Sequence, residues 1–323
     1  MEKRRIIVDC DPGVDDAIAL AYAAANQDKF QILGITAVSG NQSIEKVTRN
    51  ALNVAEYFGL DVPVARGMEG PIVKEPLSAG EIHGENGLGQ CEFPEAAGAV
   101  LEEHAVLFLY RTLKELPKGK KVTMIATGPL TNIAMLLKLF PKAKEKILEI
   151  IFMGGAAMGG NVTPSAEFNI YADPEAASIV FQSGIPLVMC GLDATLKCTL
   201  KRNQVMKLCQ SGNPAAKICG DMAGFVLENT SAKYRGEVSI HDVVPWMYLL
   251  HPEIFTAKRT ILSVECADGP ARGTTICDLR WWDHDEEGLT SAVLLDADQE
   301  KFQEYLITAL YELGETMKGK YKE

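Results

Sequence analysis

Apolar runs of strand length alternate with segments of helical period along most of the chain. The first run, residues 5–9, predicts a buried strand, and residues 15–27 predict the helix that follows it. The further predicted strands are residues 30–38, 121–127, 148–153, 186–190, 260–266 and 292–295. The further predicted helices are residues 43–58, with Ser43 as the N-cap, 131–140, 173–182 and 299–317.

This alternation predicts an α/β fold with a mostly parallel, Rossmann-like open sheet flanked by helices. Residues 200–250 are rich in helical patterns and interrupt the alternation, so we expect a helix-rich insertion there. The chain contains no Gly/Ser linker, low-complexity run or internal repeat. We therefore expect a single domain over residues 1–323.

Composition and charge narrow the classes of partner. The 323 residues are 47% hydrophobic, which is ample for a large buried core. The formal net charge is -11 and the pI about 5.1. Because an acidic surface repels phosphate backbones, nucleic acid is not an expected partner.

The lack of recognisable targeting signals and the spacing of the cysteines lead us to expect a cytoplasmic protein with no membrane partner. The N-terminal segment lacks the apolar core and cleavage site of a signal peptide, and no apolar run reaches transmembrane length. None of the eight cysteines forms a CxxC pair or lies near a histidine at zinc-ligand spacing. Reduced core thiols are the simpler interpretation of these residues.

The sequence DCDPGVDD at residues 9–16 is the strongest chemical signal. Four aspartates this close together repel one another, and helix capping explains only one of them, at Asp15. A bound hard cation would offset the repulsion. Calcium accepts six to eight oxygen ligands and suits carboxylates and carbonyls, although the spacing is not that of an EF-hand. These residues therefore predict a metal site.

Other polar clusters also follow predicted strands. Glu167 and Asn169 flank Phe168 directly before a predicted helix, and a solvated loop with a cap is the plain interpretation of that stretch. Together with Asn161 and the Met-Gly-Gly sequence that begins at Met153, it is typical of a site that binds hydroxyl groups, since carboxylates and amides suit a sugar. Parallel sheets bind ligands beyond the carboxyl ends of their strands, which is where these residues are expected.

Two histidines are candidates for contact with a ligand. His241 precedes Asp242 in an apolar setting, where a lone histidine is usually a core residue. The pair changes that interpretation, because Asp242 can ligate a metal while His241 faces the ligand. His83 lies in the glycine-bearing loop HGENG, for which a surface turn is an equal alternative.

At this point the chain resembles the inosine-uridine nucleoside hydrolase family. DCDPGVDD resembles the N-terminal fingerprint of that family. The likeness continues in order over most of the chain, through SGN (39–41), KVTRN (46–50), HGENGLG (83–89), TGPLTNIA (127–134), MGG (153–155), GN (160–161), AEFNIYADPEAA (166–177) and HD (241–242). One departure is Val243, where a proline is frequent in the family.

The resemblance implies hydrolysis of the N-glycosidic bond of ribonucleosides with a Ca²⁺ cofactor, in a dimer or tetramer. It implies that Asp11, Asp16, Asp242 and the Thr127 carbonyl hold calcium and that Asp11 is the general base. The residues expected at the ribose are Asp15, Asn41, Asn161, Glu167 and Asn169, with Met153 nearby. The residues expected at the base are His83, Phe168 and His241. His241 is the expected proton donor, and it implies pyrimidine-preferring or broad specificity.

Two other functions fit parts of the sequence. A phosphatase of the haloacid dehalogenase type also begins with a strand that ends in D-x-D, here Asp9 and Asp11. That motif requires Thr or Val four residues after the first Asp, and this chain has Gly13. The other alternative is a non-catalytic protein that binds nucleosides or calcium, which the presence of Asp11 beside a full ligand set argues against.

Overall fold

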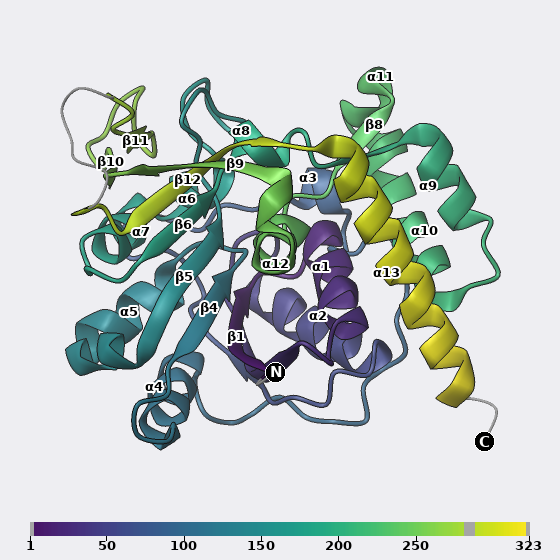
Figure 1. Cartoon of the computed structure of the whole chain (residues 1–323), viewed down its shortest axis with the longest axis horizontal. Helices are drawn as coiled ribbons and strands as arrows, with labels where there is room; N and C mark the ends of the chain where they lie inside the picture. The colour runs from purple at the N-terminus through teal and green to yellow at the C-terminus, as the bar shows by residue number, and fades with distance from the viewer. Residues whose placement is uncertain (1–2, 281–287, 321–323) are drawn as a thin grey trace.

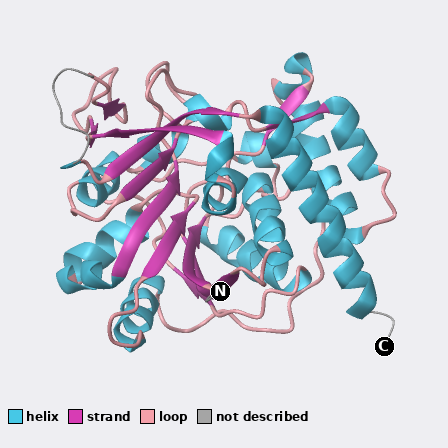
Figure 2. Cartoon of the chain, in the orientation of Figure 1, coloured by secondary structure: helices cyan, strands magenta, loops and turns pink. Residues whose placement is uncertain are grey.

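The computed structural model describes residues 3–280 and 288–320 and forms one α/β domain (Figures 1 and 2). Its centre is an eight-stranded sheet with strand order β3-β2-β1-β4-β5-β6-β12-β9, in which all pairs are parallel except β12 with β9. The first six strands follow the order 3-2-1-4-5-6 of the doubly wound nucleotide-binding fold. The Rossmann-like, mostly parallel sheet predicted from the sequence is therefore confirmed.

The strands of the central sheet are short and largely buried. They are β1 (Arg4–Cys10), β2 (Phe30–Ala37), β3 (Val64–Arg66), β4 (Val122–Ala126), β5 (Ile147–Met153), β6 (Leu187–Cys190), β9 (Phe255–Thr260) and β12 (Ser291–Ala297). In β4 and β6 every residue is buried, because helices cover both faces of the sheet. This explains why these segments are continuous apolar runs in the sequence.

Helices pack on the two faces of the sheet and enclose two main apolar cores. One face carries α4 (Ala105–Glu115), α5 (Thr131–Leu139) and α7 (Pro174–Phe181). The other carries α1 (Val14–Ala25), α2 (Ile44–Tyr57), α12 (Val243–Leu250) and the closing helix α13 (Gln299–Lys320). Among the described residues, no helix has the length and apolar character needed to cross a membrane.

The predicted insertion is helical, as expected, but it also contains a small antiparallel ribbon. Its helices are α9 (Arg202–Cys209), α10 (Pro214–Asn229) and α11 (Ala232–Arg235), and α12 follows. The ribbon joins β7 (Thr199–Lys201) to β8 (Glu237–Ser239) with Thr199 opposite Ser239. The remaining short elements are α3 (Gly80–His83), α6 (Phe168–Ala172), α8 (Leu192–Thr195), and two 3-10 helices, Pro141–Lys146 and Pro252–Ile254.

Some local expectations were wrong. The predicted strand at 260–266 is divided, because β9 ends at Thr260 and Leu262–Val264 forms β10 in a separate two-stranded sheet with β11 (Thr275–Cys277). Ser43 occupies the N-cap position of α2, but its side chain makes no capping hydrogen bond to the helix backbone. Strand β3 and helix α4 were not predicted.

Candidate active site

The candidate site lies where the strand order of the sheet reverses, between β1 and β4. Asp11 follows β1, and Thr127 follows the neighbouring β4. Asn41 follows β2 on one side, and Gly154 and Gly155 follow β5 on the other. A crevice opens at such a reversal because the connections leave in opposite directions, so the sheet itself brings these residues together.

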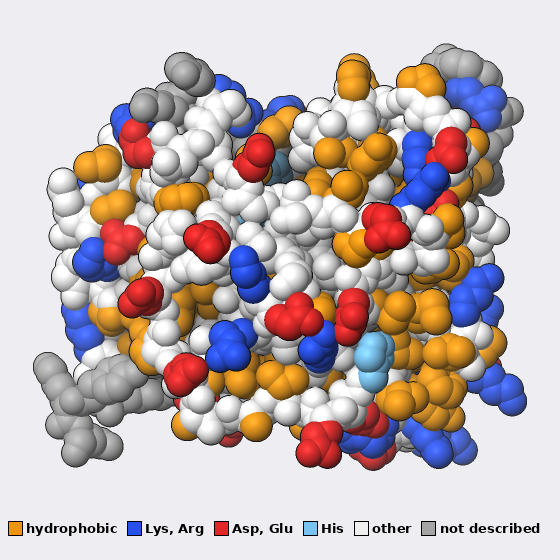
Figure 3. Space-filling model, turned by 180° about the vertical axis from the view of Figure 1, so that it is seen from behind, with side chains coloured by type: hydrophobic (Ala, Val, Ile, Leu, Met, Phe, Trp, Pro, Cys, Tyr) orange, Lys and Arg blue, Asp and Glu red, His pale blue; other side chains and the backbone are white. Residues whose placement is uncertain are grey.

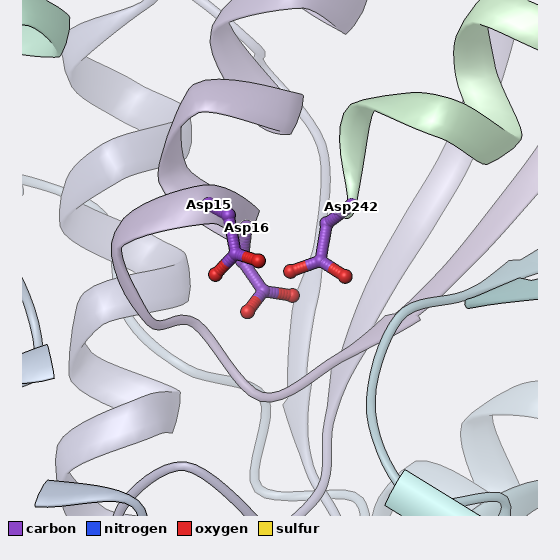
Figure 4. A group of neighbouring side chains, drawn as sticks. All are labelled: Asp15, Asp16 and Asp242. Carbon is purple, nitrogen blue, oxygen red and sulfur yellow. The ribbon is translucent and has the colours of Figure 1, made fainter. Parts of the chain in front are cut away.

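The acidic cluster combines the first turn of α1 with the start of α12. Asp15 and Asp16 lie in that first turn, and Asp242 directly precedes α12. Oxygens of these three carboxylates lie within 4.8 Å of one another, and Figure 4 shows the three side chains converging. Asp16 is held in place by the backbone N–H of Gly13 (3.0 Å) and by the hydroxyl of Thr127 (2.6 Å), which both donate to it.

Asp11 is buried beside this cluster and is not fully satisfied. Its Oδ2 accepts a hydrogen bond from the backbone N–H of Asn41 at 2.7 Å, whereas its Oδ1 has no partner among the described residues. A Cβ on Gly40 would lie 2.1 Å from Oδ2, and a Cβ on Gly128 would lie 2.8 Å from Oδ1. The two glycines therefore leave room for the carboxylate and nothing larger.

These carboxylates carry a strong electrostatic penalty. Burial, followed by the charge of neighbouring aspartates, raises the pKa of Asp11 and of Asp242 well above the ordinary range, and raises the pKa of Asp16 to about 7. The unpartnered oxygen of Asp11 and the all-oxygen donor set fit a hard cation. Thr127 fits the same set, because its carbonyl accepts a hydrogen bond from Asn169 Nδ2 at 2.8 Å and keeps a second lone pair.

Asp9, in contrast, is not part of this cluster. It is fully buried, and its Oδ1 accepts hydrogen bonds from the Thr36 hydroxyl (2.5 Å) and from Asn132 Nδ2 (2.8 Å). Burial raises the pKa of Asp9 to about 7. The sequence assigned no role to Asp9, and the structure gives its Oδ1 two polar partners, while its Oδ2 has none among the described residues.

A second polar group lies beyond β5. Glu167 is buried at the N-cap of α6, where it accepts hydrogen bonds from the backbone N–H groups of Gly155 (2.8 Å), Asn169 (3.0 Å) and Ile170 (3.2 Å). Burial raises the pKa of Glu167 to about 7, against the lowering effect of these bonds. Asn169 Nδ2 also donates to the Met153 carbonyl (3.2 Å), so Glu167, Asn169 and Met153 form one connected unit.

The remaining predicted residues lie around this unit and the acidic cluster. Asn41 uses its side-chain amide to donate to the carbonyl of Asp11 and to Asp16, both at 3.2 Å. Asn161 is exposed, and its Oδ1 accepts from the backbone N–H of Phe168 at 3.0 Å. The Phe168 side chain is half-buried at the start of α6.

Both predicted histidines lie near Asp15. His83 Nδ1 accepts the backbone N–H of Val14 at 3.1 Å and lies 4.0 Å from Asp15 Oδ1. Burial lowers the pKa of His83 and of His241, and the negative charge of Asp15 partly offsets this for each. Burial therefore favours the neutral form of both rings, and a neutral ring has one N–H donor.

Several polar residues that hold the site in place were not predicted from the sequence. Thr36 and Asn132 hold Asp9, and Thr195 lies 2.8 Å from His241 Nδ1. The available signal was position: Thr195 comes shortly after the predicted strand at 186–190, at the same edge as the other site residues. Nothing in the local sequence indicates that Thr195 supports a site residue, since threonines are common in the segments that follow strands.

Comparison with known proteins identifies the family. Residues 6–304 match the family described as inosine-uridine preferring nucleoside hydrolase. The pyrimidine-specific ribonucleoside hydrolase RihB of Escherichia coli is 41% identical over 279 residues, which cover 86% of this chain and 88% of that protein.

Solved structures of nucleoside hydrolases share the fold. A purine-preferring ribonucleoside hydrolase from Gardnerella vaginalis superposes with a TM-score of 0.88 at 32% identity, covering 97% of this chain and all of that one (100%). The plant nucleoside hydrolase PpNRh1 gives a TM-score of 0.86 at 28% identity, covering 96% and 99%. The match excludes the dehalogenase-type phosphatase and the non-catalytic binding protein. The chain belongs to the inosine-uridine preferring nucleoside hydrolase family and is a ribonucleoside hydrolase.

Proposed function

We propose that this hydrolase uses Ca²⁺ and prefers pyrimidine ribonucleosides. The observation that carries the metal is the buried, unpartnered Asp11 Oδ1 beside three converging carboxylates. Asp11, Asp16, Asp242 and the Thr127 carbonyl would hold the ion. When bound, the ion supplies an electrophilic anchor for hydroxyl and water oxygens. Calcium suits the set better than zinc because all four ligands are oxygens, and it is proposed over magnesium because magnesium demands a tighter octahedron of ligands.

Asp11 is the proposed general base. Its buried carboxylate has one oxygen without a partner among the described residues, and a carboxylate positioned beside a water can accept its proton. Asp15, Asn41, Asn161, Glu167 and Asn169 are proposed to bind the ribose hydroxyls, with Met153 nearby. The rigid bonding of Glu167 and Asn169 supports this role, since binding energy from fixed groups positions the reacting carbon.

His83, Phe168 and His241 are proposed to face the base. As the C1′–N bond breaks, electrons move onto the base, and an N–H donor from His241 stabilises the charge that develops there. The pyrimidine preference rests on the 41% identity to an enzyme named for pyrimidine specificity. Broad inosine–uridine specificity is the second candidate, because a purine-preferring enzyme shares the fold.

A substrate and metal screen tests these proposals. Uridine, cytidine, inosine and adenosine are each incubated with the enzyme, and free ribose is measured with a reducing-sugar assay. We expect kcat/KM to be highest for uridine and cytidine, to vanish with a chelator and to return with Ca²⁺. Higher kcat/KM for inosine would contradict the pyrimidine preference. Full activity of a preparation shown metal-free by elemental analysis would contradict the metal.

We also propose that the whole chain forms one cytoplasmic hydrolase domain that assembles as a dimer or tetramer. The eight cysteines are all free, as expected in a reducing compartment. Leu107, Leu139 and Leu148 are each about half exposed, and Figure 3 shows apolar side chains gathered toward the right-hand edge of the rear face. Subunit contacts would cover such a surface. Light scattering that gives the mass of one 35.1 kDa chain would contradict the assembly.

A further inference from the structure

His241 is held by a hydroxyl rather than by a carboxylate or carbonyl. Its Nδ1 lies 2.8 Å from the Oγ1 of Thr195, a residue with no solvent exposure. Thr195 ends the one-turn helix α8, which directly follows β6. His241 Nε2 makes no hydrogen bond to any residue in the described part of the chain, so this nitrogen is free for a ligand.

The backbone fixes the two residues relative to each other. The ribbon pairs Thr199 with Ser239, and the next bond along it runs from the N–H of Ile240 to the carbonyl of Cys198 at 2.9 Å. These contacts join the segment directly before His241 to the segment directly after Thr195. Secondary structure therefore fixes the backbone of both segments and brings the ring of His241 within reach of the Thr195 hydroxyl.

The direction of this hydrogen bond follows from counting donors and acceptors. A threonine hydroxyl carries one proton, and within the described residues His241 Nδ1 is the sole hydrogen-bond partner of Thr195 Oγ1. If Nδ1 carried a proton and donated it, the Thr195 hydroxyl proton would remain buried without an acceptor, which is costly. If the Thr195 hydroxyl donates to Nδ1, its one proton has an acceptor. Nδ1 is then the acceptor, and the proton of the neutral ring is on Nε2.

We propose that Thr195 is a positioning residue that holds His241 in the Nε2–H form, so that Nε2 donates a hydrogen bond to the departing base. This inference rests on the role proposed above for His241 and adds the group that selects the proton's place. The ligand it selects is a leaving group with an acceptor next to the breaking bond, such as the O2 carbonyl of a pyrimidine. A leaving group that is already a stable anion gains little from the donor.

The test compares Thr195→Val and Thr195→Ala in the calcium-loaded enzyme with uridine and with p-nitrophenyl riboside. Valine keeps the shape of threonine without the hydroxyl, and alanine removes any pressure of the new methyl group on the ring. We expect kcat for uridine to fall about tenfold in both, the effect of one hydrogen bond to a developing charge, with KM within about twofold. The p-nitrophenyl riboside should lose no more than about twofold, because its leaving group needs no donor.

Two further variants serve as controls. Thr195→Ser keeps the hydroxyl and should restore uridine turnover to within about twofold of the wild type, since one neutral hydrogen bond is regained. Thr48→Val is the matched control, because Thr48 is also a buried threonine but its hydroxyl has no partner among the described residues. Its kinetics should match the wild type with both substrates. Unchanged uridine kcat in Thr195→Val and Thr195→Ala would overturn the proposal.

A spectroscopic measurement tests the proton position without reference to turnover. Two-bond ¹H–¹⁵N spectra of the ¹⁵N-histidine enzyme, with the His241 signals assigned by their loss in His241→Ala, distinguish Nε2–H from Nδ1–H. We expect Nε2–H in the wild type and Thr195→Ser, and a mixture in Thr195→Val. An Nδ1–H ring in the wild type would refute the inference even if His241 serves the leaving group. Equal losses on both substrates in His241→Ala would instead overturn the role of His241 itself.

Discussion

Removing the metal should destabilise the protein more at high pH than at low pH. Oxygens of Asp15, Asp16 and Asp242 lie within 4.8 Å of one another. At an effective dielectric constant of about 20, two charges at that separation repel by about 3 kcal/mol. Three such pairs sum to about 10 kcal/mol, which is as large as the whole stability of a typical domain. The metal-free protein must therefore take up protons at Asp16 and Asp242 or lose stability.

The direction of the pH effect follows from the raised pKa values. Burial raises the pKa of Asp16 to about 7 and those of Asp11 and Asp242 well above their ordinary range. A carboxyl whose pKa is raised on folding binds protons more tightly in the folded state. Its penalty is absent below the unfolded pKa, near 4, and grows as the pH rises toward the folded pKa. The free energy of unfolding of the metal-free protein should therefore fall between about pH 4 and pH 7.

Differential scanning calorimetry with a chelator or with excess Ca²⁺ measures the effect. An ion at about 100 times its Kd adds about 3 kcal/mol, which corresponds to about 4 °C in Tm for a chain of 323 residues. We expect that difference at pH 8 and a smaller one at pH 5, where protons compete for the carboxylates. Asp242→Asn removes one charge and should reduce both the pH slope and the chelator effect. Equal Tm values with chelator and Ca²⁺ at pH 8, or a difference that shrinks as the pH rises, would refute the reasoning.

Three substitutions test other parts of the site. Asp11→Asn should lower kcat by at least about 10²-fold at saturating Ca²⁺ because an amide cannot accept the proton of water; turnover within a few-fold of wild type would assign the base elsewhere. Gly128→Ala would place a Cβ 2.8 Å from Asp11 Oδ1, so Ca²⁺ affinity by calorimetric titration should fall and stability drop by about 1–3 kcal/mol. Gly212→Ala is the control, because a Cβ added at Gly212 would meet no atom within 4 Å. It should change neither the Ca²⁺ affinity nor the stability. Glu167→Gln must set its NH₂ group against at least one backbone N–H, so urea unfolding should show a loss of about 1–3 kcal/mol; an unchanged midpoint would contradict the three-bond arrangement.

The central sheet could be predicted because its signal is local. Strands buried on both faces are continuous apolar runs, and β4 and β6 have every residue buried. Strand β9 gave no such signal, since residues such as Thr256 and Ala257 are exposed at the sheet edge and its pairing is antiparallel to β12. Edge strands with exposed side chains lack the apolar run, and their partner is distant in sequence. The expected strand at 260–266 had an apolar run, but its second half pairs with β11 in a separate sheet, and that partner cannot be read from the local pattern.

The acidic residues of the site could be predicted for a different reason. Several carboxylates in a short segment need compensation wherever the chain places them, so the four aspartates of residues 9–16 indicate a cation from their spacing. The choice of Asp11 and Asp16 as its ligands came from the family resemblance. The repulsion argument applies equally to all four aspartates, however, and could not show that Asp9 lies outside the acidic cluster. Its partners, Thr36 and Asn132, come from β2 and α5. Only the fold decides which carboxylate meets such donors.

The two histidines share one arrangement of donors. His83 Nδ1 accepts the N–H of Val14, a group that can only donate, so the neutral ring carries its proton on Nε2. Thr195 imposes the same form on His241 if its hydroxyl donates, as we propose. Burial lowers the pKa of both rings and so favours their neutral form, and a neutral ring beside the acidic cluster does not repel a bound cation. A site that needs a cation at the sugar and donors at the base is best served by histidines held neutral, with each N–H directed by a buried donor on the opposite side of the ring.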